Sequence, residues 1–167
     1  MKAILISIKP KYVANILNGK KTLEIRKAAP KCKLPIDVYI YCTLTKNNGI
    51  FLYDMKHDKP ILRNGKVVAK FTLNKAEEYK PRTGMLFTYS FGLDKSCLTY
   101  SEIDAYGYKE GKGYQTLYAW HIDNLEIFDR PKELNSFVSK IIVNKEEGIT
   151  TKLYMQKAPQ SWQFIEV

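Results

Sequence analysis

The sequence predicts an α+β protein that is mainly β, a mixed β-barrel with one or two short helices packed against it. Short runs of alternating or β-branched residues recur along the chain, turn residues separate them, and few segments have helical spacing. Many short strands joined by turns are typical of a closed sheet. A length of 167 residues without an internal repeat predicts a single domain over residues 1–167.

The N-terminal elements are expected to be a strand, a helix and a second strand. Residues 3–8 form a β-branched run of strand length. A helix is predicted over residues 10–18, because Pro10 suits its first position and Gly19 suits the left-handed position after its end. Residues 22–26 then alternate, which is typical of a strand with two different faces.

The middle of the chain is expected to add two long strands and an inserted hairpin. Residues 37–43 are apolar or aromatic on both faces, which is typical of a strand buried on both sides. Residues 66–73 alternate and follow the turn signal Asn64-Gly65. The two apolar runs within residues 46–65 are expected to pair as the hairpin.

The C-terminal half is expected to contain a second helix and several strands. Thr99 and Glu102 have the spacing of a capping box for a helix over residues 99–106. The other expectations are a polar loop or helical turn at 75–84, a short strand or loop at 87–91, strands at 117–122, 125–128 and 162–167, a turn at 131–134, a short helix or strand at 136–143, and a charged loop at 144–151.

The net charge of +10 and the pI of about 9.4 favour an anionic partner such as a nucleic acid, a nucleotide or a membrane surface. Lysine-rich usage in an AT-rich genome would give the same charge without a partner. Basic residues gather in segments between residues 9 and 33, where they would steer a polyanion with a salt-dependent affinity.

Cysteine usage and hydropathy bear on the compartment. Three cysteines that lie far apart, without a C-x-x-C pair, favour a reducing environment over a disulfide framework. No apolar run approaches the ~18 residues of a membrane span, and the first residues do not have the pattern of a signal peptide. We therefore expect a cytoplasmic protein with no membrane partner.

The motif G-x-K-x-x-E-x-R combines Gly19, Lys21, Glu24 and Arg26 at the start of the second strand. Lysine supplies a point charge for phosphate, arginine supplies a planar fork of donors, and a carboxylate accepts from the amino group of a base. The alternative is structural: Glu24 and Arg26 simply pair on a strand face, where an exposed pair contributes little.

This spacing resembles the signature of the ASCH domain, a relative of the PUA domains that bind RNA. Residues 118–122 and 158–162 also look like the later strands of that family. The resemblance implies a PUA-like barrel and a pocket near the end of the first strand and the start of the last. It covers most of the chain and says least about residues 46–65, which look like an insertion.

Candidate ligand-binding residues follow from the motif, the basic segments, the aromatic side chains on strands and the resemblance. Sheet aromatics beside a basic surface can stack unpaired bases, although most aromatic side chains are expected in the core. The candidates are Ser7, Lys9, Lys21, Glu24, Arg26, Trp120, Ser161 and Trp162.

An amidohydrolase is the first enzymatic alternative. One branch of the family resembles an amidohydrolase acting on 4-acetylcytidine, with the motif lysine as the catalytic residue and a threonine where this chain has Glu24. Lys21 would be the general base here, but an adjacent carboxylate favours the charged ammonium. That branch also uses a later carboxylate, for which Asp94 is the nearest candidate, with Ser96 and Glu102 close by.

A ribonuclease is the second alternative, because some related proteins are described as ribonucleases. RNA cleavage needs a general acid and a base. His57 lies in the insertion, where solvent is its expected environment, and His121 lies on an alternating strand, where it is expected in the core or at its rim. A protein-interaction module is a third interpretation, because family members occur beside parts of transcription coactivators.

The leading interpretation is a small RNA- or nucleotide-binding module without a cofactor. No pair of cysteine or histidine residues has the spacing of metal ligands, so no metal is expected. Lys21 is expected to be exposed, with its ammonium reaching into the cleft, so that its loss weakens binding rather than folding. Arg26 is expected to pair with Glu24 and to stabilise the fold.

Overall fold

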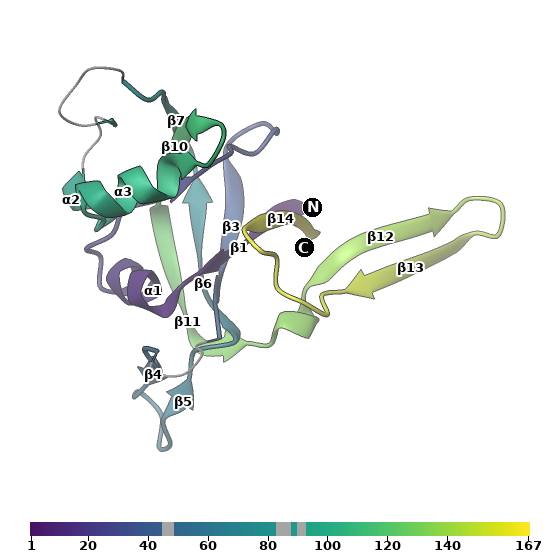
Figure 1. The fold of residues 1–167 in the computed structure, drawn as a ribbon. Coiled ribbons are helices and arrows are strands. Elements are labelled where there is room, and N and C mark those ends of the chain that lie inside the picture. Colours follow the sequence, from purple (N-terminus) through teal and green to yellow (C-terminus); the bar gives the residue numbers. More distant parts are fainter. Residues whose placement is uncertain (45–48, 83–87, 90–92) are drawn as a thin grey trace.

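A computed structural model describes residues 1–44, 49–82, 88–89 and 93–167 and has the predicted mainly β, α+β class (Figure 1). In chain order the elements are β1 (Lys2–Ile8), α1 (Pro10–Leu17), β2 (Leu23–Arg26), β3 (Ile36–Cys42), β4 (Tyr53–Asp54), β5 (Ile61–Leu62), β6 (Lys66–Leu73), β7 (Ala76–Tyr79), α2 (Leu93–Ser96), α3 (Tyr100–Gly107), β8 (Tyr108–Lys109), β9 (Gly113–Tyr114), β10 (Leu117–His121), β11 (Asp123–Lys132), the 3-10 helix η1 (Leu134–Ser136), β12 (Val138–Asn144), β13 (Ile149–Tyr154) and β14 (Trp162–Glu166). Within these ranges no helix has the length and apolar character needed to cross a membrane.

The strands form a large mixed sheet and a smaller one. The seven-stranded sheet has the order β11-β6-β3-β1-β14-β12-β13, in which β1 and β3 are parallel and the other neighbours are antiparallel. A second sheet has the order β2-β10-β7. Among the described residues no ladder joins the ends of the seven-stranded sheet, so the sheet is mixed as predicted but its closure into a barrel is not confirmed.

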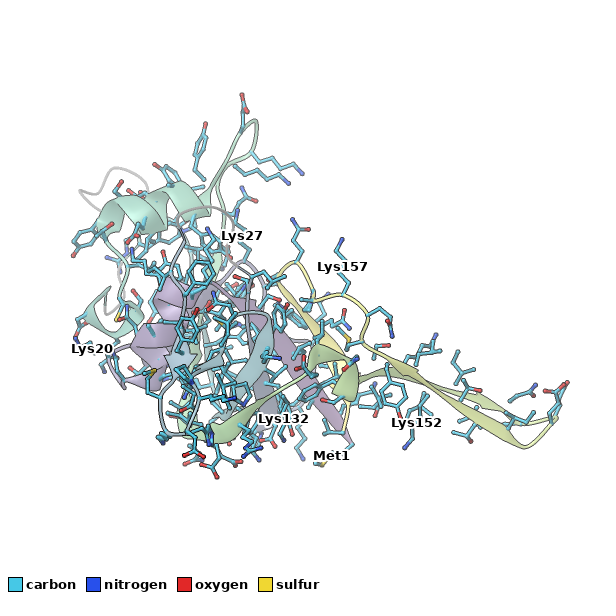
Figure 2. All side chains as sticks on the ribbon, turned by 90° about the horizontal axis from the view of Figure 1, so that it is seen from below. Met1, Lys20, Lys27, Lys132, Lys152 and Lys157 are labelled. Carbon is cyan, nitrogen blue, oxygen red and sulfur yellow. The ribbon has the colours of Figure 1, made fainter. Side chains whose placement is uncertain are left out.

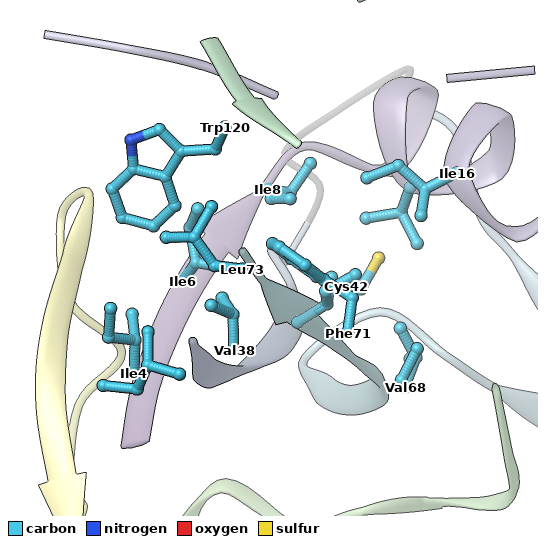
Figure 3. Packing of buried hydrophobic residues seen from close by; sticks show 14 residues of the cluster. Ile4, Ile6, Ile8, Ile16, Val38, Cys42, Val68, Phe71, Leu73 and Trp120 are labelled. Carbon is cyan, nitrogen blue, oxygen red and sulfur yellow. The ribbon is translucent and has the colours of Figure 1, made fainter. Parts of the chain in front are cut away.

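The main core lies between the large sheet, α1 and β10 (Figure 3). β1 is buried on both faces: Ile4 and Ile6 pack in this core, whereas Leu5 packs on the other face in a second cluster with Phe128. Trp120 on β10 is fully buried and closes the main core at one end. Removal of these aliphatic side chains from water stabilises the fold by roughly 1.5–3 kcal/mol for each one.

Both predicted helices are present with the expected caps. Pro10 lies at the start of α1, and Gly19 follows its end with a φ of 75°, the left-handed conformation that glycine adopts without strain. At α3 the Glu102 N–H donates to Thr99 Oγ1 at 3.1 Å, and the Thr99 N–H donates to Glu102 Oε2 at 2.8 Å. The capping box predicted from the sequence is therefore confirmed.

The hairpin expected within residues 46–65 is present as β4 and β5. Asp54 and Arg63 form a buried ion pair of 2.8 Å beside it. The side-chain oxygen of Asn64 accepts from the Leu52 N–H at 2.8 Å. This bond joins the residue before β4 to the turn that follows β5. Residues 45–48 of this segment lie outside the described part of the chain.

Four expectations on local structure are corrected. Residues 75–84 were expected to be a polar loop or helical turn, but they contain β7. This strand pairs with β10, which is distant in the chain. The turn expected at 131–134 begins inside the long strand β11. The helix α2 lies in a stretch where none was expected. The charged loop expected at 144–151 contains the start of β13.

At residues 136–143 the strand alternative is correct, since β12 occupies most of that range. The short strand or loop expected at 87–91 falls mostly outside the described residues.

The hairpin of β12 and β13 projects from the body of the protein and is here called the arm, residues 138–154 (Figure 1). One bridge, Val138 opposite Glu166, joins it to β14. At its base the Met155 N–H donates to the Phe137 carbonyl at 2.8 Å. The arm is therefore an extension of the large sheet at its β13 end.

Candidate functional site

A cleft of about 640 Å³ opens between the end of β1, α1, β2 and α3. This volume is in the range of small-molecule sites, roughly 300–1,000 Å³. Five of the predicted site residues line it: Ser7, Lys9, Lys21, Glu24 and Arg26. The motif and the end of the first strand thus meet at one place, where the resemblance implied a pocket.

Lys21 forms the floor of the cleft and is 2% exposed. Its Nζ donates to the carbonyl oxygens of Leu23 at 2.8 Å and Ser96 at 2.6 Å, and it lies 3.2 Å from Glu24 Oε2. Two of the three ammonium protons are therefore donated to carbonyl oxygens, and the charge is paired with the Glu24 carboxylate. The expectation that Lys21 is exposed with a free ammonium is therefore wrong.

Backbone hydrogen bonds on both sides of Lys21 explain its burial. The Lys21 N–H donates to the Asn15 carbonyl of α1 at 2.9 Å, and the Thr22 N–H donates to the Lys95 carbonyl of α2 at 2.9 Å. These two bonds fix the backbone at Lys21 between α1 and α2, and the side chain is buried there. Sequence spacing cannot reveal this contact, because α2 is distant in the chain.

Arg26 links three parts of the chain around the cleft. Its Nη2 lies 3.0 Å from Glu24 Oε1 and donates to the Ser7 carbonyl at 2.8 Å, and its Nη1 donates to Ser161 Oγ at 3.3 Å. Arg26 is 7% exposed, and among the described residues its Nε is buried without a hydrogen-bond partner. The predicted pairing of Arg26 with Glu24 is therefore confirmed, and the pair is buried.

Glu24 lies between the two cations and is 6% exposed. Each carboxylate oxygen contacts one cation, Oε2 with Lys21 and Oε1 with Arg26. An ionised carboxylate offers about four lone-pair sites, so two remain after these contacts. Glu24 lines the cleft and can accept hydrogen bonds from a ligand there.

Two tyrosines line the walls, and neither was singled out from the sequence. Tyr12 of α1 has its ring 5.4 Å from Lys21 Nζ, and burial raises the pKa of its hydroxyl. Tyr106 of α3 carries Lys27 Nζ 5.0 Å above its ring, and burial raises its pKa as well. Both phenols therefore stay protonated near neutral pH. In the sequence, Tyr12 shares the apolar spacing of Val13 and Ile16 in α1, which is typical of a core face and gives no sign of a role in the cleft.

Glu102 lies at the cleft and joins α3 to α1. The hydrogen bond from the Thr99 N–H and that from Lys11 hold the pKa of Glu102 at about 2. Lys11 Nζ is 2.9 Å from Glu102 Oε1, and the Tyr12 hydroxyl donates to the same oxygen at 3.4 Å. This carboxylate is ionised at neutral pH and already has several donors.

The other predicted site residues lie beside the cleft or in the core. Ser161 is exposed and reaches the site through its bond to Arg26. Trp120 is buried, donates from Nε1 to the Ala28 carbonyl at 3.2 Å and packs on Trp162 with ring centroids 5.5 Å apart. Neither tryptophan is among the residues that line the cleft.

Of the groups considered for catalysis, Lys21 and Glu102 line the cleft, whereas Asp94 and the two histidines do not. Asp94 is exposed on α2 and does not line it. His57 Nε2 lies 2.8 Å from the Asp129 carbonyl, and His121 Nε2 lies 3.4 Å from Glu77 Oε2, both outside the lining. In the described ranges no group of three or more His, Cys, Asp or Glu side chains is placed to hold a metal ion.

Fold and site together define a small α+β domain with a cleft whose floor is a buried Lys–Glu–Arg cluster. The structure is similar to the crystal structure of ASCH from Zymomonas mobilis, with a TM-score of 0.58 and 19% identity over 98% of this chain and 87% of that one. A single-substitution variant of that protein gives a TM-score of 0.60 with 15% identity over 98% and 88%. No protein-family model matches the sequence, and the search of curated proteins gives no significant match.

The chain therefore has the fold of these ASCH structures. The resemblance inferred from the motif of Gly19, Lys21, Glu24 and Arg26 is confirmed at the level of the fold. Identities of 15–19% show the fold alone.

Proposed function

We propose that the protein binds RNA or a nucleotide in the cleft and that Glu24 is the group that contacts the base. The observation that carries this proposal is a buried carboxylate on the floor of a concave site, oriented by two cations and with acceptor sites to spare. Amino and imino groups of bases are the donors that such a carboxylate accepts from. Tyr12 and Tyr106 also line the cleft, and aromatic side chains of this kind can stack on a base.

Phosphates would contact the basic rim rather than the floor. Lys9 is an exposed lysine among the lining residues, and Lys27 is exposed beside Tyr106. In Figure 2, Lys20 and Lys27 project from the half of the molecule that carries α1 and α3, away from the arm. This arrangement supports a polyanion that crosses the mouth of the cleft while one base enters it.

Lys21 positions Glu24 in this proposal and does not contact the ligand. Its ammonium already donates to the Leu23 and Ser96 carbonyls and is paired with Glu24, so a ligand would have to displace one of these three contacts. The same geometry gives no support to the hydrolase alternative, in which Lys21 acts as the general base. No catalytic role is proposed.

The test uses two double variants with the same change in net charge. Lys9→Ala with Lys27→Ala removes two lysines at the cleft, and Lys152→Ala with Lys157→Ala removes two exposed lysines on and beside the arm (Figure 2). A labelled single-stranded RNA is titrated by fluorescence anisotropy at several salt concentrations. Removing one lysine–phosphate interaction lowers the slope of log K against log salt by roughly 0.7.

We expect the slope to fall by about 1.4 in the cleft variant and to stay at the parent value in the arm variant. Equal reductions in the two variants would show diffuse electrostatic binding and would contradict a site at the cleft. Absence of RNA binding by the parent at low salt, together with no response to mononucleotides, would reject the function itself.

A further inference from the structure

The arm exposes aliphatic side chains along its whole length. Six apolar residues of the arm are each at least 38% exposed: Ile141, Ile142, Val143, Ile149, Leu153 and Tyr154. In Figure 2 the side chains of β12 and β13 stand away from the body on both sides of the ribbon. An isolated two-stranded hairpin is only marginally stable in water, so a ribbon with this composition calls for a partner.

One face of the arm has a symmetric pattern. In the β12–β13 ladder Lys140 is opposite Leu153, Ile142 is opposite Thr151, and Asn144 is opposite Ile149. Opposite residues share a face, and alternate residues along a strand do as well. This face therefore carries an aliphatic side chain at the base, at the middle and at the tip of the arm.

We propose that this face is a homodimer interface, in which the arm of a second copy packs on it in the antiparallel direction. A two-fold axis at the pair Ile142–Thr151 brings Ile142 against its own copy and Leu153 against Ile149 of the other chain. Lys140 then faces Asn144, so no like charges meet. The face is complementary to itself, which is what a two-fold interface requires.

The charge of the arm favours a second copy over a nucleic acid. Residues 138–154 carry three lysines and two glutamates, which is close to neutral in a chain with a net charge of +10. A surface that binds polyanions would concentrate the positive charge of the chain. The strands of the arm are instead rich in isoleucine, valine and leucine, as expected for an interface between protein chains.

The opposite face of the arm is less suited to self-association. There Ile141 is opposite Lys152, and Val143 is opposite Thr150. Lys152 is an exposed cation in the middle of this face, and Figure 2 shows it standing out from the ribbon. A two-fold axis at the pair Ile141–Lys152 would bring the two copies of Lys152 against each other, whereas Lys140 of the proposed face lies at its base and meets Asn144.

The test introduces one charge on either face of the full-length protein. Ile142→Lys places two cations at the two-fold axis, and Val143→Lys adds the same charge on the other face of the same strand. Sedimentation velocity over a wide dilution series measures the oligomeric state, and circular dichroism confirms that both variants fold. We expect a dimer for the parent and for Val143→Lys, and a monomer for Ile142→Lys.

A mixture of Ile142→Lys and Ile142→Glu sharpens the test, because opposite charges at the axis should restore association as a mixed dimer. A parent that is monomeric at every concentration overturns the proposal. So does a dimer that survives Ile142→Lys, or a mixture that stays monomeric. If Ile142→Lys, which adds positive charge, instead abolished RNA binding, the arm would belong to a nucleic-acid site and the proposal would be wrong.

Discussion

The cleft and the arm both reverse the usual distribution of side chains. At the cleft floor three charged residues are almost completely buried, whereas on the arm aliphatic residues such as Val143 are 58% exposed. Charged side chains are almost never fully buried unless they are paired, and contiguous apolar surface is rarely left in water. Each region is therefore costly to the protein unless it has a partner.

The two regions differ in where that partner lies. The buried charges of the cleft find one another and nearby carbonyl oxygens within the chain. The aliphatic side chains of the arm have no such cover among the described residues. Substitutions at the cleft should accordingly change the free energy of unfolding, and substitutions on the face of the arm that carries Ile142 should change association. The four expectations below test this contrast, beginning with the largest effect.

Lys21→Ala should destabilise the protein by about 3–5 kcal/mol, because it removes one of the two cations that contact the buried Glu24 carboxylate and the ammonium that donates to the Ser96 carbonyl. Lys20→Ala is the matched control, since Lys20 is the adjacent lysine and is exposed. It should stay within about 0.5 kcal/mol of the parent. Urea unfolding followed by circular dichroism measures both. Equal stabilities would mean that the buried cluster does not hold the fold.

Arg26→Lys should cost about 1–3 kcal/mol although it keeps the charge. The guanidinium reaches the Ser7 carbonyl, Glu24 and Ser161 from different edges, and an ammonium cannot contact all three from one point. The exposed Arg130 serves as the control, where the same exchange should have little effect. Identical unfolding curves for the parent and Arg26→Lys would show that the separate contacts of the guanidinium do not contribute to stability.

Glu102→Gln should remove a pH-dependent contribution of about 1 kcal/mol to the free energy of unfolding, which is the usual size for a helix cap. The pKa of Glu102 is lowered from 4.5 to about 2 by its bonds to the Thr99 N–H and Lys11. A lowered pKa means that this stability is present above pH 4.5 and is lost as the pH falls towards 2. The difference in Tm between parent and variant should therefore shrink over that interval. A difference in Tm that stays constant over this pH interval would contradict a stabilising role of the ionised Glu102.

Val143→Thr should have the smallest effect on folding, less than about 0.5 kcal/mol when measured at low protein concentration. The side chain is at the end of the arm and has little packing to lose. If the arm is an interface, the Tm of the parent should also rise with protein concentration. A large loss of stability at low concentration would show that the arm is part of the folding core.

Local signals in the sequence predicted much of the fold. The cap of α3 needs only Thr99 and Glu102 three residues apart, and the alternation of β6 is visible within its own eight residues. β7 was missed because its residues look polar and its partner strand β10 is distant in the chain, whereas β13 was missed although its partner β12 directly precedes it. In β13 the aliphatic residues do alternate, but the nearby charges of residues 145–147 suggested a loop.

Five of the eight predicted site residues line the cleft, and the exposure expected of Lys21 was wrong. The motif placed Lys21, Glu24 and Arg26 together, and the pairing of the last two followed from their shared strand face. The burial of Lys21 depends on a carbonyl of α2, and no spacing within the motif encodes that contact. Tyr106 was missed for the same reason, because α3 meets the motif only in three dimensions.

The bond from Lys21 to the Ser96 carbonyl also has a consequence for the order of folding. The two residues are 75 positions apart, whereas Lys21 and Glu24 are neighbours on one short segment. Closing a long stretch of chain costs entropy before the contact contributes anything, so this bond should form after the transition state. A substitution that removes it alone should then accelerate unfolding and leave the refolding rate nearly unchanged. The cleft floor would be the last part of the body to assemble during folding and the first to open during unfolding.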